Sequence, residues 1–410
     1  MLFRPRRLAV AVAFLAVVVL LDFVLERAIP DSSIRQLLML AACNIVVALS
    51  LNIINGMAGQ FSIGHAGFLL LGAYTSAIVS SHLHYAMGAG DVTFARSFVI
   101  VPLGLLASGL VAALFGFLVG LPSLRLKGDY LAIVTLGFAE ILRLVIQTAS
   151  ASGRETVAAA WGHVGKDGVV GPFFHAIAVM IANLEGPRGY AGPNATTGLP
   201  LYAGPFWIFG LAGLAAVLAW RIKFSGWGRA LRALREDEIA AAAVGVDPTR
   251  YKVMSFVVSA AAGGVAGGMM AQMRDGAPIV QPESFGFQAS FDAITMVILG
   301  GSGSVTGAML GGIFVTFSVK AIELAQGTAA VQSLRTQFPA LDLNALRMML
   351  YAALLIALMV LRPEGLLGER ELFAKKKTKG GPPSASPGGA GGAPEQGAKA
   401  EVIAASEVSS

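Results

Sequence analysis

Long apolar runs separated by short polar segments make up most of this chain. A helix that crosses the ~30 Å hydrocarbon core of a bilayer needs roughly 20 apolar residues, and about ten runs come near that length. The sequence therefore predicts spans at 8–26, 35–55, 62–82, 97–120, 130–149, 203–221, 252–272, 286–301, 305–325 and 345–361. The predicted fold class is all-α: a polytopic transmembrane helical bundle in which some helices are broken or re-entrant.

The first apolar run follows three arginines, Arg4, Arg6 and Arg7, which is also how a signal peptide begins. A signal peptide ends in a small-residue cleavage site, whereas here the polar residues Asp22 and Glu26 interrupt the position where one would be expected. We therefore expect a signal anchor that is retained in the mature protein.

The distribution of lysine and arginine gives the orientation. If the N-terminus is cytoplasmic, the segments predicted to lie inside include 1–7, 121–129, the loop 222–251 and the C-terminal tail, which together hold most of the basic residues. Cytoplasmic loops carry an excess of such residues. We therefore expect both termini in the cytoplasm.

Two segments differ from the rest in composition. Residues 150–202 form a long stretch rich in Gly, Pro, Ala and Asn, in which Val169–Leu184 is apolar but too short to span, so we interpret it as interfacial or re-entrant. The tail is rich in Gly, Pro, Ser and Ala and cannot bury enough apolar area to fold. The predicted domains are a transmembrane domain over 1–368, including an extended periplasmic segment at 150–202, and a disordered cytoplasmic tail over 369–410.

Composition agrees with a chain solvated by lipid. Of the 410 residues, 55% are hydrophobic and 13% are charged, about half the charge of a soluble domain. The net charge of +6 arises from basic residues beside apolar runs, which indicates topology signals rather than a nucleic-acid surface. The single cysteine, Cys43, excludes an intrachain disulfide and a cysteine-based metal site.

A glycine-rich segment, Gly56–Gly67, joins the second and third predicted spans. Its polar residues Gln60, Ser62 and His65 need partners at membrane depth, either in other helices or along a translocation path. We take them as candidate path residues, with interhelical hydrogen bonding as the alternative. No second His or carboxylate stands at ligand spacing, so we expect no metal site.

A second glycine-rich segment, Gly300–Gly307, separates the eighth and ninth predicted spans. It lacks the Gly-Lys-Ser/Thr ending of a phosphate-binding loop and lies between apolar runs, so we exclude nucleotide binding there. The two glycine-rich segments fall in opposite halves of the chain, as in transporters with pseudo-symmetric halves.

Ionisable residues inside apolar runs are costly and therefore candidates for function. Glu140 and Arg143 stand three residues apart and can neutralise each other on one helix face, as can Lys320 and Glu323. Asp292 has no such neighbour within its own run and is expected to hydrogen-bond across helices or to cap a broken one.

The most specific segment lies between the sixth and seventh predicted spans, at Trp227–Pro248. Its Ala, Leu, Arg and Glu residues favour helix, and Gly245 followed by Pro248 ends the helical stretch. We expect two short helices below the membrane, one basic and one built of small residues. A plain linker needs no such helix, whereas a groove on another protein can receive one.

Several stretches resemble the permease subunits of branched-chain amino acid ATP-binding-cassette importers. They cover the chain in order from about 35 to 368, and the LKGDYLAIVTLG stretch is similar to the M-type rather than the H-type subunit. The matching stretches are Gly56–Tyr74, Leu121–Val145, Gly226–Phe256, Val297–Gly312 and Arg362–Leu366.

The resemblance implies a non-enzymatic subunit in the inner membrane of a bacterium, without a cofactor of its own. Its implied partners are an H-type permease, two cytoplasmic ATPases that use ATP, and a periplasmic binding protein that delivers leucine, isoleucine or valine. The ATPases would dock on the loop 222–251. The candidate coupling residues are Arg232, Glu236, Glu238, Ala240, Ala241, Ala242 and Gly245.

One segment departs from the family pattern. Only Gly192–Pro200 loosely resembles the Thr-Gly-Gly-type motif that similar permeases have before the sixth span. Urea, short amides or other amino acids therefore stay open as solutes of the same importer class. A secondary transporter or channel without an ATPase is the alternative of another class, and a membrane enzyme lacks any nucleophile and base that we could assign.

Overall fold

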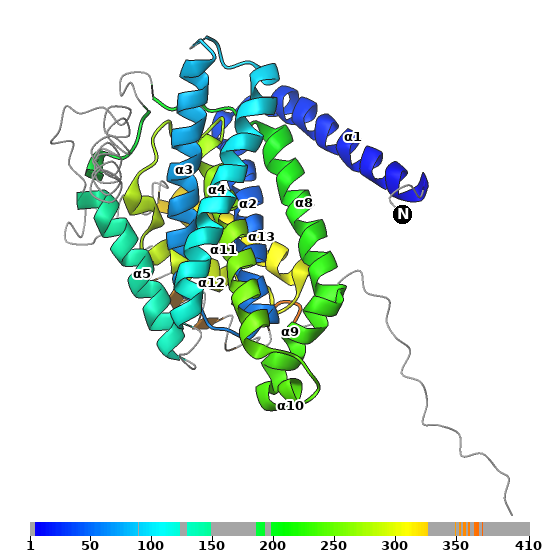
Figure 1. The fold of residues 1–410 in the computed structure, drawn as a ribbon. Coiled ribbons are helices and arrows are strands. Elements are labelled where there is room, and N and C mark those ends of the chain that lie inside the picture. Colours follow the sequence, from blue (N-terminus) through cyan, green and yellow to red (C-terminus); the bar gives the residue numbers. More distant parts are fainter. Residues whose placement is uncertain are drawn as a thin grey trace, which may run out of the picture. The chain divides into compact units, whose positions relative to one another are not determined.

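The computed structural model describes residues 5–88, 90–123, 129–148, 186–192 and 198–326, with short pieces at 349, 352–353, 356–357, 360, 365–368 and 371. This part of the chain is a bundle of helices (Figure 1). Beyond the helices, its regular backbone pairing consists of two isolated β-bridges, Tyr190 with Val280 and Ala203 with Met273. The all-α prediction is confirmed.

The helices and helical turns follow the apolar runs of the sequence. In chain order they are α1 (Pro5–Ala28), α2 (Ser32–Leu51), the π-helix η1 (Asn52–Met57), α3 (His65–Ala86), α4 (Phe94–Ser123), α5 (Asp129–Thr148), η2 (Gly186–Arg188), α8 (Pro205–Phe224), α9 (Gly226–Glu236), α10 (Glu238–Ala243), α11 (Pro248–Gln272), η3 (Pro282–Phe285), α12 (Phe287–Gly300) and α13 (Val305–Gln326).

Seven helical segments are long and apolar enough to cross a membrane, judged by length and composition. They confirm the predicted spans two to seven and nine. α1 has 24 residues and includes the first predicted span, 8–26, whereas α12, at the eighth predicted span, has 14 residues, about 21 Å of helix. α12 is therefore a short helix of the kind expected in a bundle with broken spans. The tenth predicted span, 345–361, lies largely outside the described residues, as do most of 150–202 and the tail.

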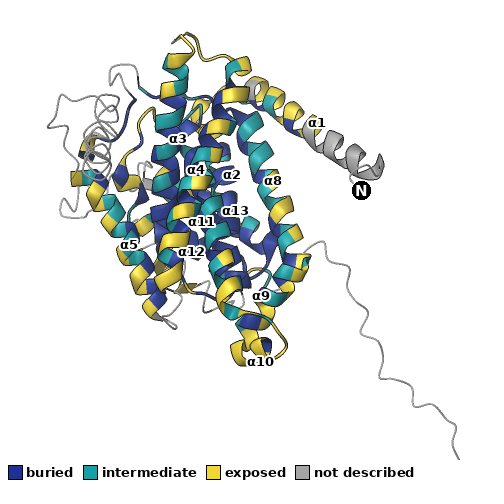
Figure 2. Cartoon of the chain, in the orientation of Figure 1, coloured by how far each residue is buried: buried dark blue, intermediate teal, exposed yellow. Residues whose placement is uncertain are grey.

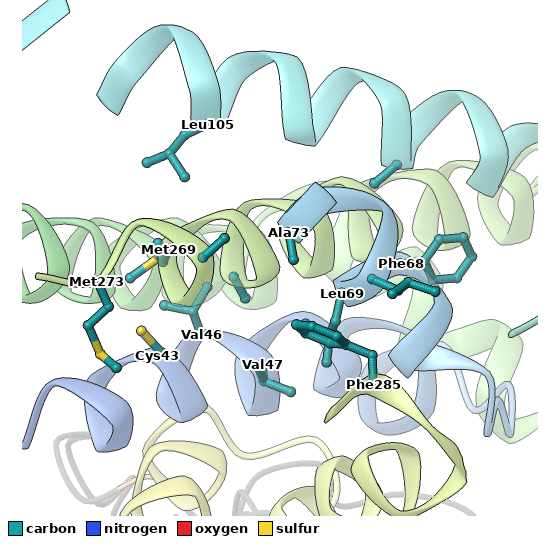
Figure 3. Packing of buried hydrophobic residues seen from close by; sticks show 14 of the residues in the cluster. Cys43, Val46, Val47, Phe68, Leu69, Ala73, Leu105, Met269, Met273 and Phe285 are labelled. Atoms are coloured by element: carbon teal, nitrogen blue, oxygen red, sulfur yellow. The ribbon is translucent and has the colours of Figure 1, made fainter. Parts of the chain in front are cut away.

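α11 lies at the centre of the bundle against α3 and α4 (Figure 1). Glycines allow this approach: a Cβ on Gly267 would overlap the backbone of Leu69 in α3, and one on Gly264 would overlap Ala112 in α4. Lipid tails are as apolar as the side chains, so helices in a membrane associate through such close packing. An apolar cluster that includes Cys43 and Met269 lies beside these contacts (Figure 3).

The outer helices expose apolar side chains. Ile133 and Ile141 of α5 and Val217 of α8 are more than half exposed, and exposed residues follow both helices in Figure 2. In water such surfaces would drive aggregation, whereas lipid solvates them. The chain is a multi-pass membrane protein.

Candidate functional site

The loop between α8 and α11 folds into the two helices that the sequence predicted. Ser225 caps α9 and accepts a hydrogen bond of 3.1 Å from the amide of Gly228. Asp237 is extended, ends α9 and caps α10, where its carboxylate accepts from the amides of Ile239 and Ala240 at 2.9 and 3.0 Å. These caps satisfy amides that a helix start leaves open, and they fix the turn between α9 and α10.

Gly245 forms the turn that leads from α10 into α11. Its φ of +91° lies in the left-handed region, and an added Cβ would meet no heavy atom within 4 Å. Only glycine adopts this conformation without strain. Asp247 then caps α11 by accepting from the amide of Arg250 at 3.2 Å, with Pro248 in the first turn.

α10 and its turn present an apolar surface. Ile239 is 83% and Val244 is 80% exposed, although Ala241 between them is buried. Glu238 holds α10 against α11 through an ion pair of 2.6 Å with Lys252. Among the sequence candidates, Ala240 and Ala242 are exposed beside this surface. Sequence reasoning missed Ile239 and Val244; the signal was a branched apolar residue at each end of the alanine run.

The basic residues of α9 point back to the membrane domain. Arg232 donates to the carbonyls of Gly228 and Lys223, each at 3.3 Å, and so covers the end of α8. Glu236 is exposed and lies 4.0 Å from Arg235. Of the predicted coupling residues, Arg232 therefore contacts the membrane domain, whereas Glu236 faces solvent.

The two glycine-rich segments meet at one place, which we call the junction: η1 with Gly59 and the turn Gly301–Ser304. The side-chain amide of Asn52 donates through its nitrogen to the backbone carbonyl of Ser304 at 3.0 Å. Its oxygen accepts from the backbone amide of Gly303 at 2.8 Å. Arg235 of α9 donates to the carbonyl of Gly56 at 2.7 Å. α9 is therefore tied to the point where α2 changes into a π-helix, a feature frequent at functional sites.

Glu371 fixes the start of α13. Its carboxylate accepts from the amides of Val305 and Thr306 at 2.8 and 3.0 Å, from the hydroxyl of Thr306 at 2.6 Å, and from Lys223 at 2.5 Å. A helix N-terminus favours such a negative charge. The carboxylate is 3% exposed. This buried residue falls within 369–410, the range that the sequence assigned to the tail.

The charge of Glu371 is stabilised by its surroundings. Burial acts to raise the pKa of its carboxyl group, but the hydrogen bonds from Lys223, from Thr306 and from the two backbone amides outweigh burial and lower that pKa below its ordinary value. Lys223 ends the helix that leads directly into α9. The same contact therefore joins the end of α8, the start of α13 and the segment after the last predicted span.

The predicted path residues lie near the junction and are buried. His65 shares a 2.7 Å hydrogen bond with Ser50, and Ser259 of α11 donates to the carbonyl of Ser50 at 2.7 Å. The backbone amide of Ser62 donates to the side-chain oxygen of Asn55 at 3.1 Å. The contact of His65 joins α3 to α2 and matches the alternative of interhelical hydrogen bonding, whereas the contact of Ser62 is local. The side-chain amide of Gln60 is buried and has no hydrogen-bond partner among the residues that the structure describes.

A half-open cavity of about 630 Å³ lies between α2, α12 and α13, beside the segment 276–285. Polar and charged side chains line it together with aliphatic ones. The polar and charged lining residues on the helices include Gln36, Asn44, Asp292, Thr316, Lys320 and Glu323. Gln60, Ser62 and His65 are not among its lining residues. Their assignment to the path stays a prediction.

The intramembrane charges form the local pairs that the spacing predicted. Glu140 accepts from Arg143 at 2.8 Å, and Arg143 also donates to Gln147 at 2.8 Å. Lys320 and Glu323 lie 3.0 Å apart. Asp292 lines the cavity from α12. In the described part of the chain, no group of three or more His, Cys, Asp or Glu residues is placed to hold a metal ion.

Comparison with known proteins finds one family. The model of the branched-chain amino acid transport system permease component matches residues 33–359. The high-affinity branched-chain amino acid transport system permease protein LivM of Escherichia coli K12 is 34% identical over 363 residues, covering 87% of this chain and 74% of that protein. LivM of Salmonella typhimurium is 33% identical, with 87% and 73% covered.

More distant similarity extends to a second kind of permease. The protein LivH of Salmonella typhimurium, also named as a high-affinity branched-chain amino acid permease, is 24% identical over 80% of this chain and 92% of its own length. No solved structure matches the chain significantly. The greater identity to LivM agrees with the M-type resemblance seen in the sequence.

Proposed function

This chain belongs to the family of branched-chain amino acid transport system permease components, and we propose that it is the M-type permease subunit of an ATP-driven importer for leucine, isoleucine and valine. The observation that carries the proposal is the extent of the family match, residues 33–359. This range includes both the membrane bundle and the α9–α10 loop.

We infer that ATP is hydrolysed by two separate cytoplasmic chains. The glycine-rich segment at Gly300–Gly307 lacks a phosphate-binding ending, and the α10 surface around Ile239 and Val244 is exposed and apolar. A small apolar projection of this kind fits a groove on a partner. This chain would need no cofactor of its own, because its role is to form part of the pore.

Closure of the ATPases would then reach the membrane through α9. Arg235 contacts the junction, and Lys223, at the end of α8, contacts the start of α13 through Glu371. A displacement of the α9–α10 unit would act on α2, α12 and α13 together. An H-type permease would complete the pore, and a periplasmic binding protein would deliver the solute at the inner membrane of the cell.

The decisive experiment is uptake by the purified complex in lipid vesicles. The proposal expects uptake of radiolabelled leucine that requires ATP and the binding protein and is unaffected by dissipating proton or sodium gradients. Uptake that follows an ion gradient and ignores ATP would contradict it and favour a secondary transporter.

The solute is tested separately through the proposed periplasmic binding protein of the complex. That protein, purified with its native ligand, should carry a branched-chain amino acid identified by mass spectrometry. A bound urea, short amide or other amino acid would keep the importer class and replace the solute. These solutes stay open because Gly192–Pro200 only loosely resembles the Thr-Gly-Gly-type motif of similar permeases.

A further inference from the structure

The cavity between α2, α12 and α13 reaches only part of the way through the bundle. On α2 its lining runs from Ser33 to Val47, about 21 Å of helix at 1.5 Å per residue. Its lining residues include none from η1 or from the turn Gly301–Ser304. There Asn52 binds both Gly303 and Ser304. The cavity therefore ends short of the junction.

Three polar side chains lie at a similar depth in this cavity. Asn44 lies eight residues before η1, and Asp292 lies eight residues before the end of α12, so each is about 12 Å along its helix from the junction. Asn44 donates to the hydroxyl of Thr316 at 2.8 Å, which places α13 at the same level. A carboxylate, an amide and a hydroxyl thus surround one level of the cavity.

The remaining lining supplies the complementary chemistry. Leu40, Val47 and Val315 contribute aliphatic surface near that level, and the Lys320–Glu323 pair carries both signs of charge farther along α13 from the junction. An ionisable group at membrane depth is costly unless it serves a site or a water-filled cavity.

We propose that this cavity is the solute vestibule of the permease and that it binds zwitterionic amino acids with aliphatic side chains. Asp292 binds the α-ammonium group, the Asn44 amide binds the α-carboxylate, and the aliphatic residues receive the side chain. The proposal deepens the proposed function and rests on it for the identity of the solute. A volume of about 630 Å³ is within the range of small-molecule sites.

The vestibule is tested by cysteine labelling of the full complex in membrane vesicles. Cys43→Ser removes the only native cysteine of this chain, and Val319→Cys or Phe317→Cys then places one thiol on α13. Val319 lines the cavity, whereas Phe317 is exposed and does not. A membrane-impermeant, positively charged thiol reagent should modify Val319→Cys much faster, and from one side of the membrane only. Equal rates for the two variants would overturn the vestibule.

Ligand recognition is tested by protection in the same assay. Leucine should slow the labelling of Val319→Cys, whereas the 2-oxo acid of leucine, which lacks the ammonium group, should not. Asp292→Asn should raise the leucine concentration needed for protection roughly tenfold or more, because a hydrogen bond between charged groups is lost. The matched control is Asp22→Asn in α1, whose carboxylate accepts from the amide of Phe206 outside the cavity.

The outcomes separate this proposal from the proposed function. Protection that survives Asp292→Asn, or equal protection by the 2-oxo acid, would overturn the assignment of Asp292. Labelling and protection require no ATP hydrolysis. If both behave as expected while uptake ignores ATP, the vestibule stands and the importer class is wrong.

Discussion

The guanidinium of Arg235 donates a hydrogen bond of 2.7 Å to the backbone carbonyl of Gly56, although 179 residues separate them in the chain. Its aliphatic part packs on Gly59, where an added Cβ would lie 2.6 Å from the Cγ of Arg235. This contact joins the last turn of α9 to the π-helix that follows α2. It is a direct contact between the proposed coupling helices and the junction.

Arg235→Met should therefore uncouple ATP hydrolysis from transport. The variant keeps an aliphatic chain but loses a charged hydrogen bond worth about 1.5–3 kcal/mol. We expect ATP hydrolysis to continue while leucine uptake per ATP falls several-fold, measured on the reconstituted complex. Arg229→Met is the control, because Arg229 is exposed on the same helix and donates a 3.4 Å hydrogen bond to the carbonyl of Phe224, away from the junction. An equal loss in both variants would indicate a general charge effect.

Ile239→Asp and Val244→Asp should each weaken the binding of the ATPase subunits. Burial of such a side chain contributes about 1.5–3 kcal/mol, so a charge there should lower affinity more than tenfold. The measurement is the amount of ATPase subunit that co-purifies with the tagged permease as the concentration of the ATPase subunit is lowered. Thr249→Asp is the control, since Thr249 is exposed in the first turn of α11 and lies outside the α10 surface. Full recovery with both variants would remove α10 as the docking surface.

Gly245→Val should disturb docking without unfolding the membrane bundle. A side chain at φ +91° costs about 1–2 kcal/mol, and this strain falls on a turn with open space around it. We expect reduced ATPase recovery and uptake with a melting temperature near that of the wild type. Gly59→Val is the contrasting variant, because its side chain would meet Arg235 and should lower the melting temperature as well. Undiminished ATP-coupled uptake by Gly245→Val would contradict the docking assignment.

Glu371→Gln should destabilise the membrane domain by up to about 3–5 kcal/mol, because it leaves Lys223 buried without its ion-pair partner. The double variant with Lys223→Met should recover part of this loss. The readout is the thermal unfolding of the purified complex in detergent. Equal melting temperatures for the wild type and Glu371→Gln would show that the ion pair contributes nothing.

The same contact predicts a pH dependence. Since folding lowers the pKa of Glu371 below its ordinary value of 4.5, the ionised carboxylate stabilises the fold above that pH. The stabilisation is lost as the pH falls through the lowered, folded-state pKa. The difference in stability between the wild type and Glu371→Gln should therefore be constant near neutral pH and shrink in acid. A difference that grows on acidification would contradict the sign of this shift.

Features that depend on local spacing could be predicted from the sequence. Six long α-helices and the combined α2–η1 segment follow the apolar runs, because a backbone in lipid must satisfy its own hydrogen bonds. The pairs Glu140–Arg143 and Lys320–Glu323 follow from positions three apart on a helix. The helices α9 and α10 follow from helix propensity and from the stop at Gly245.

Features that depend on contacts between distant segments were decided by the tertiary structure. The sequence identified two glycine-rich segments, but the bonds of Asn52 to Gly303 and Ser304, more than 250 residues away, have no local signal. Glu371 lies in the range that the sequence assigned to the tail. Its side chain is buried because the start of α13 and Lys223 lie beside it in the folded chain. The length of the apolar runs determined which segments enter the membrane, while side-chain packing alone decided which of their polar groups meet at a cavity, a junction or a docking surface.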